Sequence, residues 1–220
     1  MFRLTVIYDN ITNQDFAGSW GFSVLVETYH ESILFDTGWD GPLLIKHMNK
    51  LNIDPKYINK IVLSHQHWDH IGGLPDILQA NPRLKVYVPA SFSKNLKTEI
   101  EKRATLIEVK EPIEISHGVR SIGELGDKIK EQALILDNGY GCYVLTGCAH
   151  PGLSVIMDNA LVYGNILGIF GGFHDSTEFE RLSGLEIIAA GHCTANKEKL
   201  KERFPSEFIE IKVGLYIDLK

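Results

Sequence analysis

Short stretches in which apolar and polar residues alternate, or in which β-branched residues dominate, recur along the whole chain and predict strands. In the first half, the predicted strands cover residues 2–8, 20–28, 32–35, 61–64, 84–88 and 105–109. In the second half, they cover residues 133–137, 142–146, 166–171, 185–190 and 208–213, the last with an alternative end at Leu219.

Helix-like patterns fall between many of these strands. They cover residues 41–51, 74–79, 92–102, 152–161 and 194–204. In the last of them, Thr194 is the predicted N-cap and Pro205 the stop signal. The alternation of strands and helices, without a linker or a break in composition, predicts a single α/β domain over residues 1–220.

The strongest chemical signal is the segment IVLSHQHWDHIGGL, residues 61–74. An apolar strand leads into it, and Gly72 and Gly73 permit a tight turn into the next helix. Between them stand four ligand-type residues: His65, His67, Asp69 and His70. Residues two apart in an extended segment project the same way, so His65 and His67 can face one cation, and the pair after the bend can face a second. Burying so many polar side chains without a shared partner would be costly, so the pattern predicts a zinc, manganese or iron site.

His-Gln-His-Trp-Asp-His matches the His-x-His-x-Asp-His signature of the metallo-β-lactamase-fold superfamily, and Asp-Thr-Gly at 36–38 resembles its upstream motif. The resemblance implies an α/β (α+β) fold, a four-layer αββα sandwich with metals at the edge where strands end. Within the superfamily, FAGSWGFSVLVE, LTGCAHPG, FGGFH and GHCT are similar to the group of dihydropterin-ribofuranosylaminobenzene-phosphate synthases and their bacterial relatives.

The resemblance also implies two metal sites with three ligands each. The first would consist of His65, His67 and His150, and the second of Asp69, His70 and His192. Asp36 is expected to accept hydrogen bonds from the histidine loop and to orient it. The implied cofactor is Zn²⁺, as one or two ions, with iron or manganese as alternatives.

The sequence departs from the superfamily pattern between His150 and His192, where a carboxylate that bridges the two metals is usual. Here the stretch reads Gly-Gly-Phe-His-Asp, with His174 at the expected spacing and Asp175 beside it. His174 is the preferred site residue, as a metal ligand or a substrate contact. Asp69 and His174 are therefore the predicted catalytic residues.

The function implied is a metal-dependent hydrolase, or a related synthase or lyase, that uses a metal-activated hydroxide on a small ester- or phosphate-bearing substrate. A dihydropterin-type diphosphate is one candidate. Two alternatives stay open on the same fold: an iron-binding redox or sensor protein, and a non-catalytic metal-binding module. The flavodiiron type carries Glu where His67 stands, which weighs against the reduction of oxygen.

The composition of the chain limits the kinds of binding partner that are expected. The 220 residues include 22 Lys and Arg and 28 Asp and Glu, a formal net charge of −6, which argues against nucleic acid as a partner. No apolar run approaches the ~18 residues of a membrane span, so no membrane partner is expected. The expected partner is a small-molecule substrate. The oligomeric state is open, with a homodimer as one alternative.

The cysteines and three of the histidines occupy no ligand position of the superfamily pattern. The three cysteines form no close Cys-x-x-Cys pair and favour a reducing compartment, so a cytoplasmic location is expected. They are Cys142, Cys148 and Cys193. Three histidines outside the motifs are expected to be ordinary surface or helix residues: His30, His47 and His117.

Overall fold

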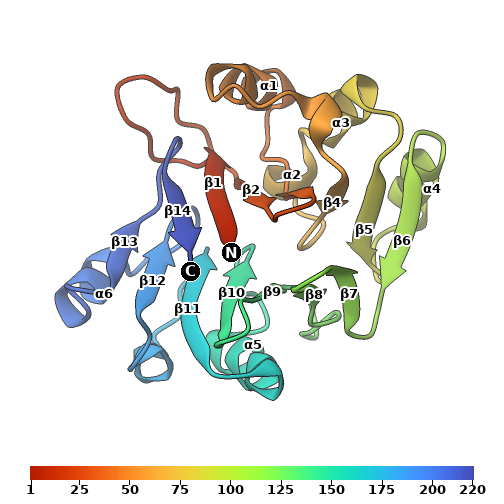
Figure 1. The fold of residues 1–220 in the computed structure, drawn as a ribbon. Helices are drawn as coiled ribbons and strands as arrows, with labels where there is room; N and C mark the ends of the chain where they lie inside the picture. Colours follow the sequence, from red (N-terminus) through yellow and green to blue (C-terminus); the bar gives the residue numbers. More distant parts are fainter. The chain divides into compact units, whose positions relative to one another are not determined.

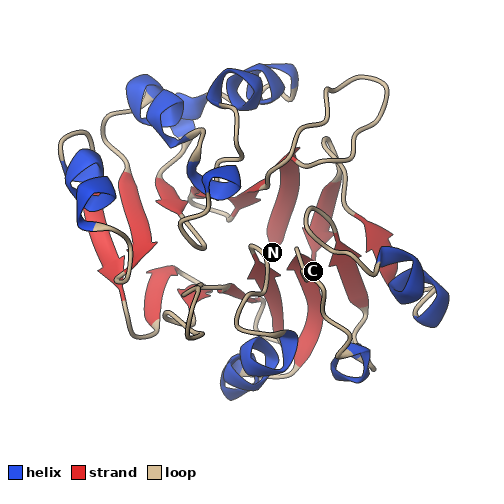
Figure 2. Cartoon of the chain, turned by 180° about the vertical axis from the view of Figure 1, so that it is seen from behind, coloured by secondary structure: helices blue, strands red, loops and turns tan.

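The computed structural model describes all 220 residues, which divide into two compact units. Unit 1 comprises Met1–Lys110 and Lys212–Lys220, and unit 2 comprises Glu111–Ile211. Each unit is built on one seven-stranded sheet. Figures 1 and 2 show the helices of each unit on one face of its own sheet. The single domain over residues 1–220 stays a prediction.

The sheet of unit 1 has the strand order β14-β1-β2-β3-β4-β5-β6. Its strands are β1 (Phe2–Tyr8), β2 (Ser23–Glu27), β3 (Ser32–Phe35), β4 (Lys60–Val62), β5 (Lys85–Pro89), β6 (Thr105–Val109) and β14 (Tyr216–Leu219). Its helices are α1 (Gly41–Lys50), the 3₁₀ helix η1 (Pro55–Tyr57), α2 (Trp68–Ile71), α3 (Leu74–Ala80) and α4 (Lys94–Glu101). The core below the helices includes Leu34, Ile61 and Val86.

The sheet of unit 2 has the strand order β13-β12-β11-β10-β9-β8-β7. Its strands are β7 (Ile113–Ser116), β8 (Val119–Ser121), β9 (Leu134–Asp137), β10 (Cys142–Thr146), β11 (Ile166–Gly171), β12 (Ile187–Ala190) and β13 (Phe208–Glu210). Its helices are α5 (Leu153–Ala160), α6 (Lys197–Arg203) and the 3₁₀ helices η2 (Leu161–Tyr163) and η3 (Phe179–Leu182). Val144, Ile169 and Ile188 are buried in its core.

The two sheets share one succession of strand pairings. In unit 1, three antiparallel pairs from β14 to β3 are followed by three parallel pairs from β3 to β6. In unit 2, three antiparallel pairs from β7 to β10 are followed by three parallel pairs from β10 to β13. The carboxyl ends of parallel strands lie at one edge of a sheet, which is where ligands bind in open α/β sheets. The ligand-type residues of both units follow strands of the parallel parts.

Apart from shifts of one to three residues at strand ends, the structure differs from the predicted strands in two places. The hairpin of β7 and β8 was not expected, because β7 at the sheet edge has four residues and β8 between β7 and β9 has three, too few for an alternation of apolar and polar residues to be recognised. The predicted strand from residue 208 towards Leu219 is two strands. Gly214, at φ 85°, turns the chain between them, and its N–H donates to the carbonyl of Val6 (2.9 Å), so β14 pairs with β1 instead of extending β13.

Helix α6 begins three residues later than predicted. The expected N-cap, Thr194, accepts a hydrogen bond from the backbone N–H of Phe173 through Oγ1 (3.0 Å), and Asn196 is the N-cap instead. Only Leu200 of α6 is buried, in agreement with a solvated helix.

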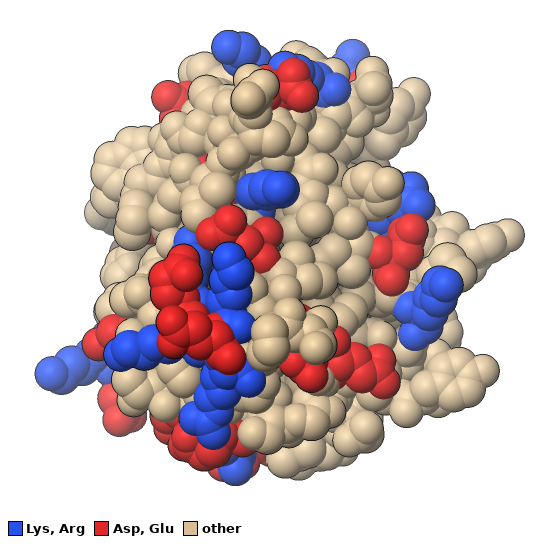
Figure 3. Space-filling view, turned by 90° about the vertical axis from the view of Figure 1, so that its left-hand side faces the viewer, with Lys and Arg blue, Asp and Glu red and all other residues tan.

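Figure 3 shows one face of the molecule, on which Lys and Arg lie among Asp and Glu rather than in a patch of one sign. No helix combines the length and the apolar character that crossing a membrane requires.

His47 lies in a helix, α1, as expected, but it is not at the surface. Its ring is buried, Nδ1 donates a hydrogen bond to the carbonyl of Ile7 (2.8 Å), and the ring of Phe16 meets it edge-on at 5.4 Å. Desolvation lowers the pKa of His47, and the bond to Ile7 opposes that shift only partly. The folded protein therefore keeps this ring neutral where an unfolded chain would already protonate it.

We expect His47 to make the protein less stable in mild acid. The unfolded chain takes up a proton at pH ~6.5 and the folded protein only at a lower pH. Stability is therefore present above pH ~6.5 and is lost as the pH falls towards the folded pKa, by at most about 1.4 kcal/mol per pH unit. Urea unfolding of metal-free protein at pH 7.5 and 5.5 should show a smaller loss in His47→Asn than in the wild type. His30→Asn, at an exposed histidine, should leave the loss unchanged; an equal loss in all three proteins would contradict the prediction.

Candidate functional site

The candidate site in unit 1 begins where two adjacent parallel strands end. Phe35 of β3 pairs with Val62 of β4, and the next residue, Asp36, donates its backbone N–H to the carbonyl of Val62 (2.9 Å). Asp36 has a positive φ of 56°, a conformation that Asp tolerates better than most residues. This turn directs its side chain to the loop that follows β4.

The Asp36 carboxylate is fully buried and accepts three hydrogen bonds of 2.7 Å, from Ser64 N, Ser64 Oγ and His70 Nδ1. Since the Ser64 hydroxyl donates its one proton to Asp36, it accepts from His65 Nδ1, 2.9 Å away. Both His65 and His70 are therefore protonated at Nδ1. In each ring Nε2 then carries the lone pair, the arrangement typical of metal-binding histidines.

The four ligand-type residues of this loop are gathered together. The ring centroid of His65 lies 4.6 Å from that of His67 and 4.1 Å from that of His70. Asp69 Oδ2 lies 3.8 Å from His70 Nε2. His65 and His70 are buried, whereas His67 is exposed. Neutral imidazoles and one carboxylate form a donor set that fits a divalent transition-type cation.

Gly72 and Gly73 are needed for space rather than for an unusual backbone. Their φ values, −61° and −81°, are open to any residue. A Cβ on Gly72 would lie 2.1 Å from the carbonyl oxygen of Trp39, and one on Gly73 would lie 2.3 Å from that of Thr37. The Asp-Thr-Gly turn is held there because Thr37 donates to the carbonyl of His70 through N (2.7 Å) and Oγ1 (3.0 Å).

Two glycine substitutions should separate space from conformation. We expect Gly72→Ala to destabilise the protein by about 3 kcal/mol, since the new methyl group meets backbone that holds the site. Gly139→Ala should cost only about 1 kcal/mol, because φ is 86° there but no atom lies within 4 Å of the added Cβ. Urea unfolding of both variants measures the difference, and equal losses would contradict the steric explanation.

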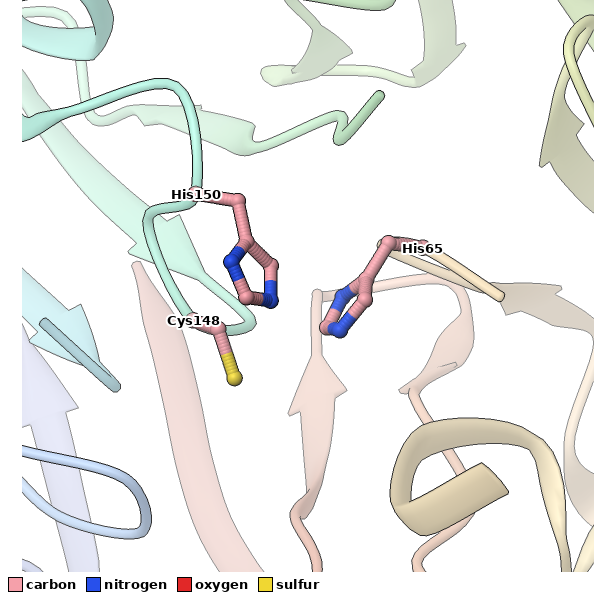
Figure 4. Close-up of side chains that lie close together, drawn as sticks. All are labelled: His65, Cys148 and His150. Atoms are coloured by element: carbon pink, nitrogen blue, oxygen red, sulfur yellow. The ribbon is translucent and has the colours of Figure 1, made fainter. Parts of the chain in front are cut away.

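The candidate site in unit 2 is formed by the turns after three neighbouring parallel strands. His150 follows β10, His174 follows β11 and His192 follows β12. The turns bind one another through Gly172 N to Gly147 O (3.1 Å), Gly191 N to Gly171 O (3.0 Å) and Ala195 N to His174 O (2.8 Å). The ring centroids of His150 and His174 are 5.1 Å apart. Figure 4 shows His150 and Cys148 on the turn after β10, and His65 beyond the end of β4.

Glu131 is the site residue that the sequence analysis missed. Its buried carboxylate accepts backbone hydrogen bonds from Gly147 (2.9 Å), Cys148 (2.9 Å) and Ala149 (3.0 Å) at Oε1, and from His150 (2.9 Å) at Oε2. The one available signal was a Glu close to the apolar run of β9, three residues before Leu134, since Glu is rarely buried without partners. Glu131 fixes the His150 turn much as Asp36 fixes the loop after β4.

His174 and Asp175 lie in the turn after β11, and their side chains pair with each other. His174 Nδ1 lies 3.0 Å from Asp175 Oδ1, and the side chains are 49% and 88% exposed. The hydrogen bond from His174 is the main cause that lowers the pKa of the Asp175 carboxyl. His174 is thus a half-exposed, polarised ring, whereas Asp175 points largely into solvent.

Backbone strain concentrates in these loops. Of the five non-glycine residues with positive φ, all but Asn52 stand at or next to a predicted site residue. These four are Asp36, Ala149, His174 and His192. Such conformations cost about 1–3 kcal/mol each and persist where the surroundings impose them, often at functional sites.

A cavity of about 570 Å³ adjoins the His150 turn. It is lined by His150, Pro151, Val155 and the loop 126–129, which includes Asp127 and Lys128. None of the three cysteines forms a disulfide, and burial raises the pKa of Cys142 to about 11. Cys193 Sγ lies 3.9 Å from the carbonyl oxygen of Cys148.

Comparisons with known proteins agree with this architecture. Residues 21–192 match the family described as the metallo-β-lactamase superfamily. A 7,8-dihydropterin-6-methyl-4-(β-D-ribofuranosyl)-aminobenzene-5'-phosphate synthase of Methanocaldococcus jannaschii is 27% identical over 93% of this chain and 92% of its own. A solved structure of a metal-dependent hydrolase of the β-lactamase superfamily is 25% identical, covers 100% and 99% of the two chains, and gives a TM-score of 0.78. A diphosphatase of the PhnP family, 16% identical over 100% and 98%, has the same fold with a TM-score of 0.70.

These matches confirm the predicted fold class, two mixed sheets with helices of the metallo-β-lactamase type. This fold implies the binding of a divalent metal, and the structure contains candidate ligand groups. The family match and the similarity to a metal-dependent hydrolase at 25% identity support an enzyme in general terms.

Proposed function

Because the chain belongs to the metallo-β-lactamase superfamily, we propose that it is a metal-dependent hydrolase acting on a small ester- or phosphate-bearing molecule. The observation that carries the proposal is the path of hydrogen bonds from Asp36 to His70 and, through Ser64, to His65. It leaves the Nε2 lone pairs of two buried rings directed at something other than this carboxylate. A purely structural role would not require both tautomers to be set by one carboxylate.

In this proposal, His65, His67 and His150 hold one metal, and Asp69, His70 and His192 hold the other. Zn²⁺ is the proposed metal, with iron or manganese as alternatives and with one or two ions bound. The imidazole and carboxylate donors of the loop after β4 support the choice of a transition-type metal over calcium. The strained φ values of 58° at Ala149 and 45° at His192 support a functional role for the turns of unit 2.

A bound divalent cation would supply water of lowered pKa and would polarise a carbonyl or phosphoryl oxygen. Asp69 is the proposed proton acceptor, since its carboxylate lies beside the buried His70. His174 is the proposed contact for the developing negative charge on substrate oxygen. Its ring is half exposed, next to His150, and its Nδ1 is held by Asp175, so Nε2 is the atom that can reach a substrate.

The substrate proposal rests on the relative and on the cavity. The Methanocaldococcus relative is named for a product that carries a dihydropterin, an aminobenzene ring and a phosphate. A phosphate-bearing substrate, with a dihydropterin-type diphosphate as one candidate, is our proposal for this chain. Lys128 in the wall of the cavity next to His150 is a suitable counter-charge.

The test is elemental analysis of protein purified without added metal, together with hydrolysis assays on esters, thioesters, lactams, phosphodiesters and the pterin substrates. We expect transition metal in the wild type and less of it in His192→Ala. The matched control His117→Ala, at an exposed histidine of the β7–β8 turn, should retain the full content. Protein without activity on any substrate at any metal loading would overturn the proposal. Retained iron with redox activity and no hydrolysis would favour the redox alternative.

A further inference from the structure

The chain has three tryptophans, and all of them are more than half exposed. The exposed fractions are 55% for Trp20, 55% for Trp39 and 68% for Trp68. Tryptophan is highly buried on average, because its large ring gains most from leaving water. One exposed tryptophan would need no explanation, but the exposure of all three is unusual for this residue type.

The three tryptophans come from separate segments that meet at one place. The position of a Cβ on Gly72 lies 2.1 Å from the carbonyl oxygen of Trp39 and 2.9 Å from that of Trp68. The corresponding position on Gly21, which follows Trp20, lies 2.8 Å from the backbone N of Trp39. The backbones of all three residues are therefore close neighbours.

This meeting point is also the candidate metal loop. Trp68 stands between His67 and Asp69 in the sequence. The Cβ position on Gly21 lies 2.7 Å from the carbonyl oxygen of Asp69, to which Phe22 also donates its N–H (3.1 Å). The segments that carry Trp20 and Trp39 are thus fixed against the same loop that supplies the ligand-type residues.

We propose that Trp20, Trp39 and Trp68 form an aromatic surface beside the 65–70 loop that binds a flat aromatic or heteroaromatic ring of the substrate. Rigid indole rings offer a large stacking area at little cost in side-chain entropy. The inference deepens the proposed function, since the ring would belong to the molecule that reacts next to it. The ring systems in the name of the Methanocaldococcus relative, dihydropterin and aminobenzene, have this flat shape.

The experiment uses the intrinsic fluorescence of these tryptophans, because every indole of the chain belongs to the proposed surface. The probes are pterin and benzoate. Cyclohexanecarboxylate is the non-aromatic control, with the same charge as benzoate. We expect saturable quenching by pterin, weaker quenching by benzoate and none by cyclohexanecarboxylate. Free tryptophan in the same solutions corrects for light absorbed by the probe.

Variants then assign the effect. Trp39→Ala and Trp68→Ala should each weaken pterin binding about tenfold, the loss expected for one stacking partner. Trp68→Phe should restore most of it. Tyr29→Ala, which removes a 92% exposed aromatic ring from the turn after β2, should change nothing. Calorimetry measures binding in the alanine variants, independently of the indoles that remain.

Three outcomes would overturn the aromatic surface: no saturable binding of pterin, equal binding of cyclohexanecarboxylate, or an equal loss in Tyr29→Ala. A fourth contrary outcome would be dimers in sedimentation together with an emission that shifts to the blue as the protein concentration rises, both abolished by Trp68→Ala. That outcome would make this surface an interface between two copies of the chain. Ring binding needs neither metal nor turnover in this experiment. Its failure is therefore distinguishable from failure of the proposed hydrolase function, which metal content and hydrolysis report.

Discussion

Replacing Glu131 by alanine is expected to lower the free energy of unfolding by about 3–5 kcal/mol. The substitution removes the acceptor of four backbone N–H groups, those of residues 147–150, in a buried position. Each buried donor left without its partner costs about 1–3 kcal/mol, and water entering the space would offset part of the sum. Urea unfolding of metal-free protein measures the loss.

Glu131→Gln tests whether the carboxylate also positions His150. The amide keeps one acceptor oxygen but presents an NH₂ group in place of the other, so the oxygen that serves three amides can stay while His150 N–H faces a donor. We expect a loss of about 1–3 kcal/mol in stability together with reduced metal content in the purified protein. The drop in metal content is the result that a purely structural role would not produce.

A matched control for Glu131 lies in the same unit. Glu178 accepts hydrogen bonds from Ser154 N (3.2 Å) and Ser154 Oγ (2.5 Å) at the start of α5, just beyond the His150 turn. Glu178→Gln should cost some stability and leave the metal content unchanged. Full metal content in Glu131→Gln, or an equal loss in Glu178→Gln, would refute a positioning role for Glu131.

The contrast between Asp36 and Glu131 shows which site residues can be predicted from the sequence and which cannot. Asp36 was predictable because it stands in a recognisable Asp-Thr-Gly motif next to a strand, and two of its three partners are side chains of another motif. Glu131 binds backbone N–H groups, which carry no residue identity, and its partners follow a strand that comes later in the chain. Only the register of β9 against β10 brings them together.

The strands that bury both faces were predicted well, because their apolar runs are nearly continuous. β3 and β10 have the predicted limits, Ser32–Phe35 and Cys142–Thr146. The errors fall where long-range contacts decide the local structure. Thr194 accepts a hydrogen bond from the backbone N–H of Phe173 instead of capping α6. His47 is buried against Phe16 and Ile7, which the pattern of its own helix does not reveal.

Asp36→Asn is expected to weaken zinc binding about 10- to 100-fold while the fold is kept. Asn has the same shape as Asp and tolerates the positive φ of 56° at this position, so neither space nor backbone changes. The amide oxygen can still accept from Ser64 N, as Oδ1 does now at 2.7 Å. The new NH₂ group, however, faces two donors, Ser64 Oγ and His70 Nδ1, both now 2.7 Å from Oδ2.

The conflict is relieved only by moving protons. His70 must lose its proton from Nδ1 and carry it on Nε2, and the Ser64 hydroxyl must turn and donate to His65 Nδ1, which moves the proton of His65 to Nε2 as well. Both rings then lose the Nε2 lone pair that a metal needs. Competition with a chromophoric zinc chelator measures the affinity, and ¹⁵N NMR of the imidazoles reports the tautomers directly.

Two variants frame the result. Asp54→Asn changes an exposed aspartate that caps η1 through Lys56 N (2.9 Å), and it should leave zinc affinity unchanged. Asp36→Ala should lose affinity and also stability, since alanine accepts no hydrogen bond and adds about 1–2 kcal/mol of strain at positive φ. Unchanged zinc affinity in Asp36→Asn, with the histidines still protonated at Nδ1, would show that this carboxylate does not set the ligand state of the loop. The proposed metal site would then lack its main support in unit 1.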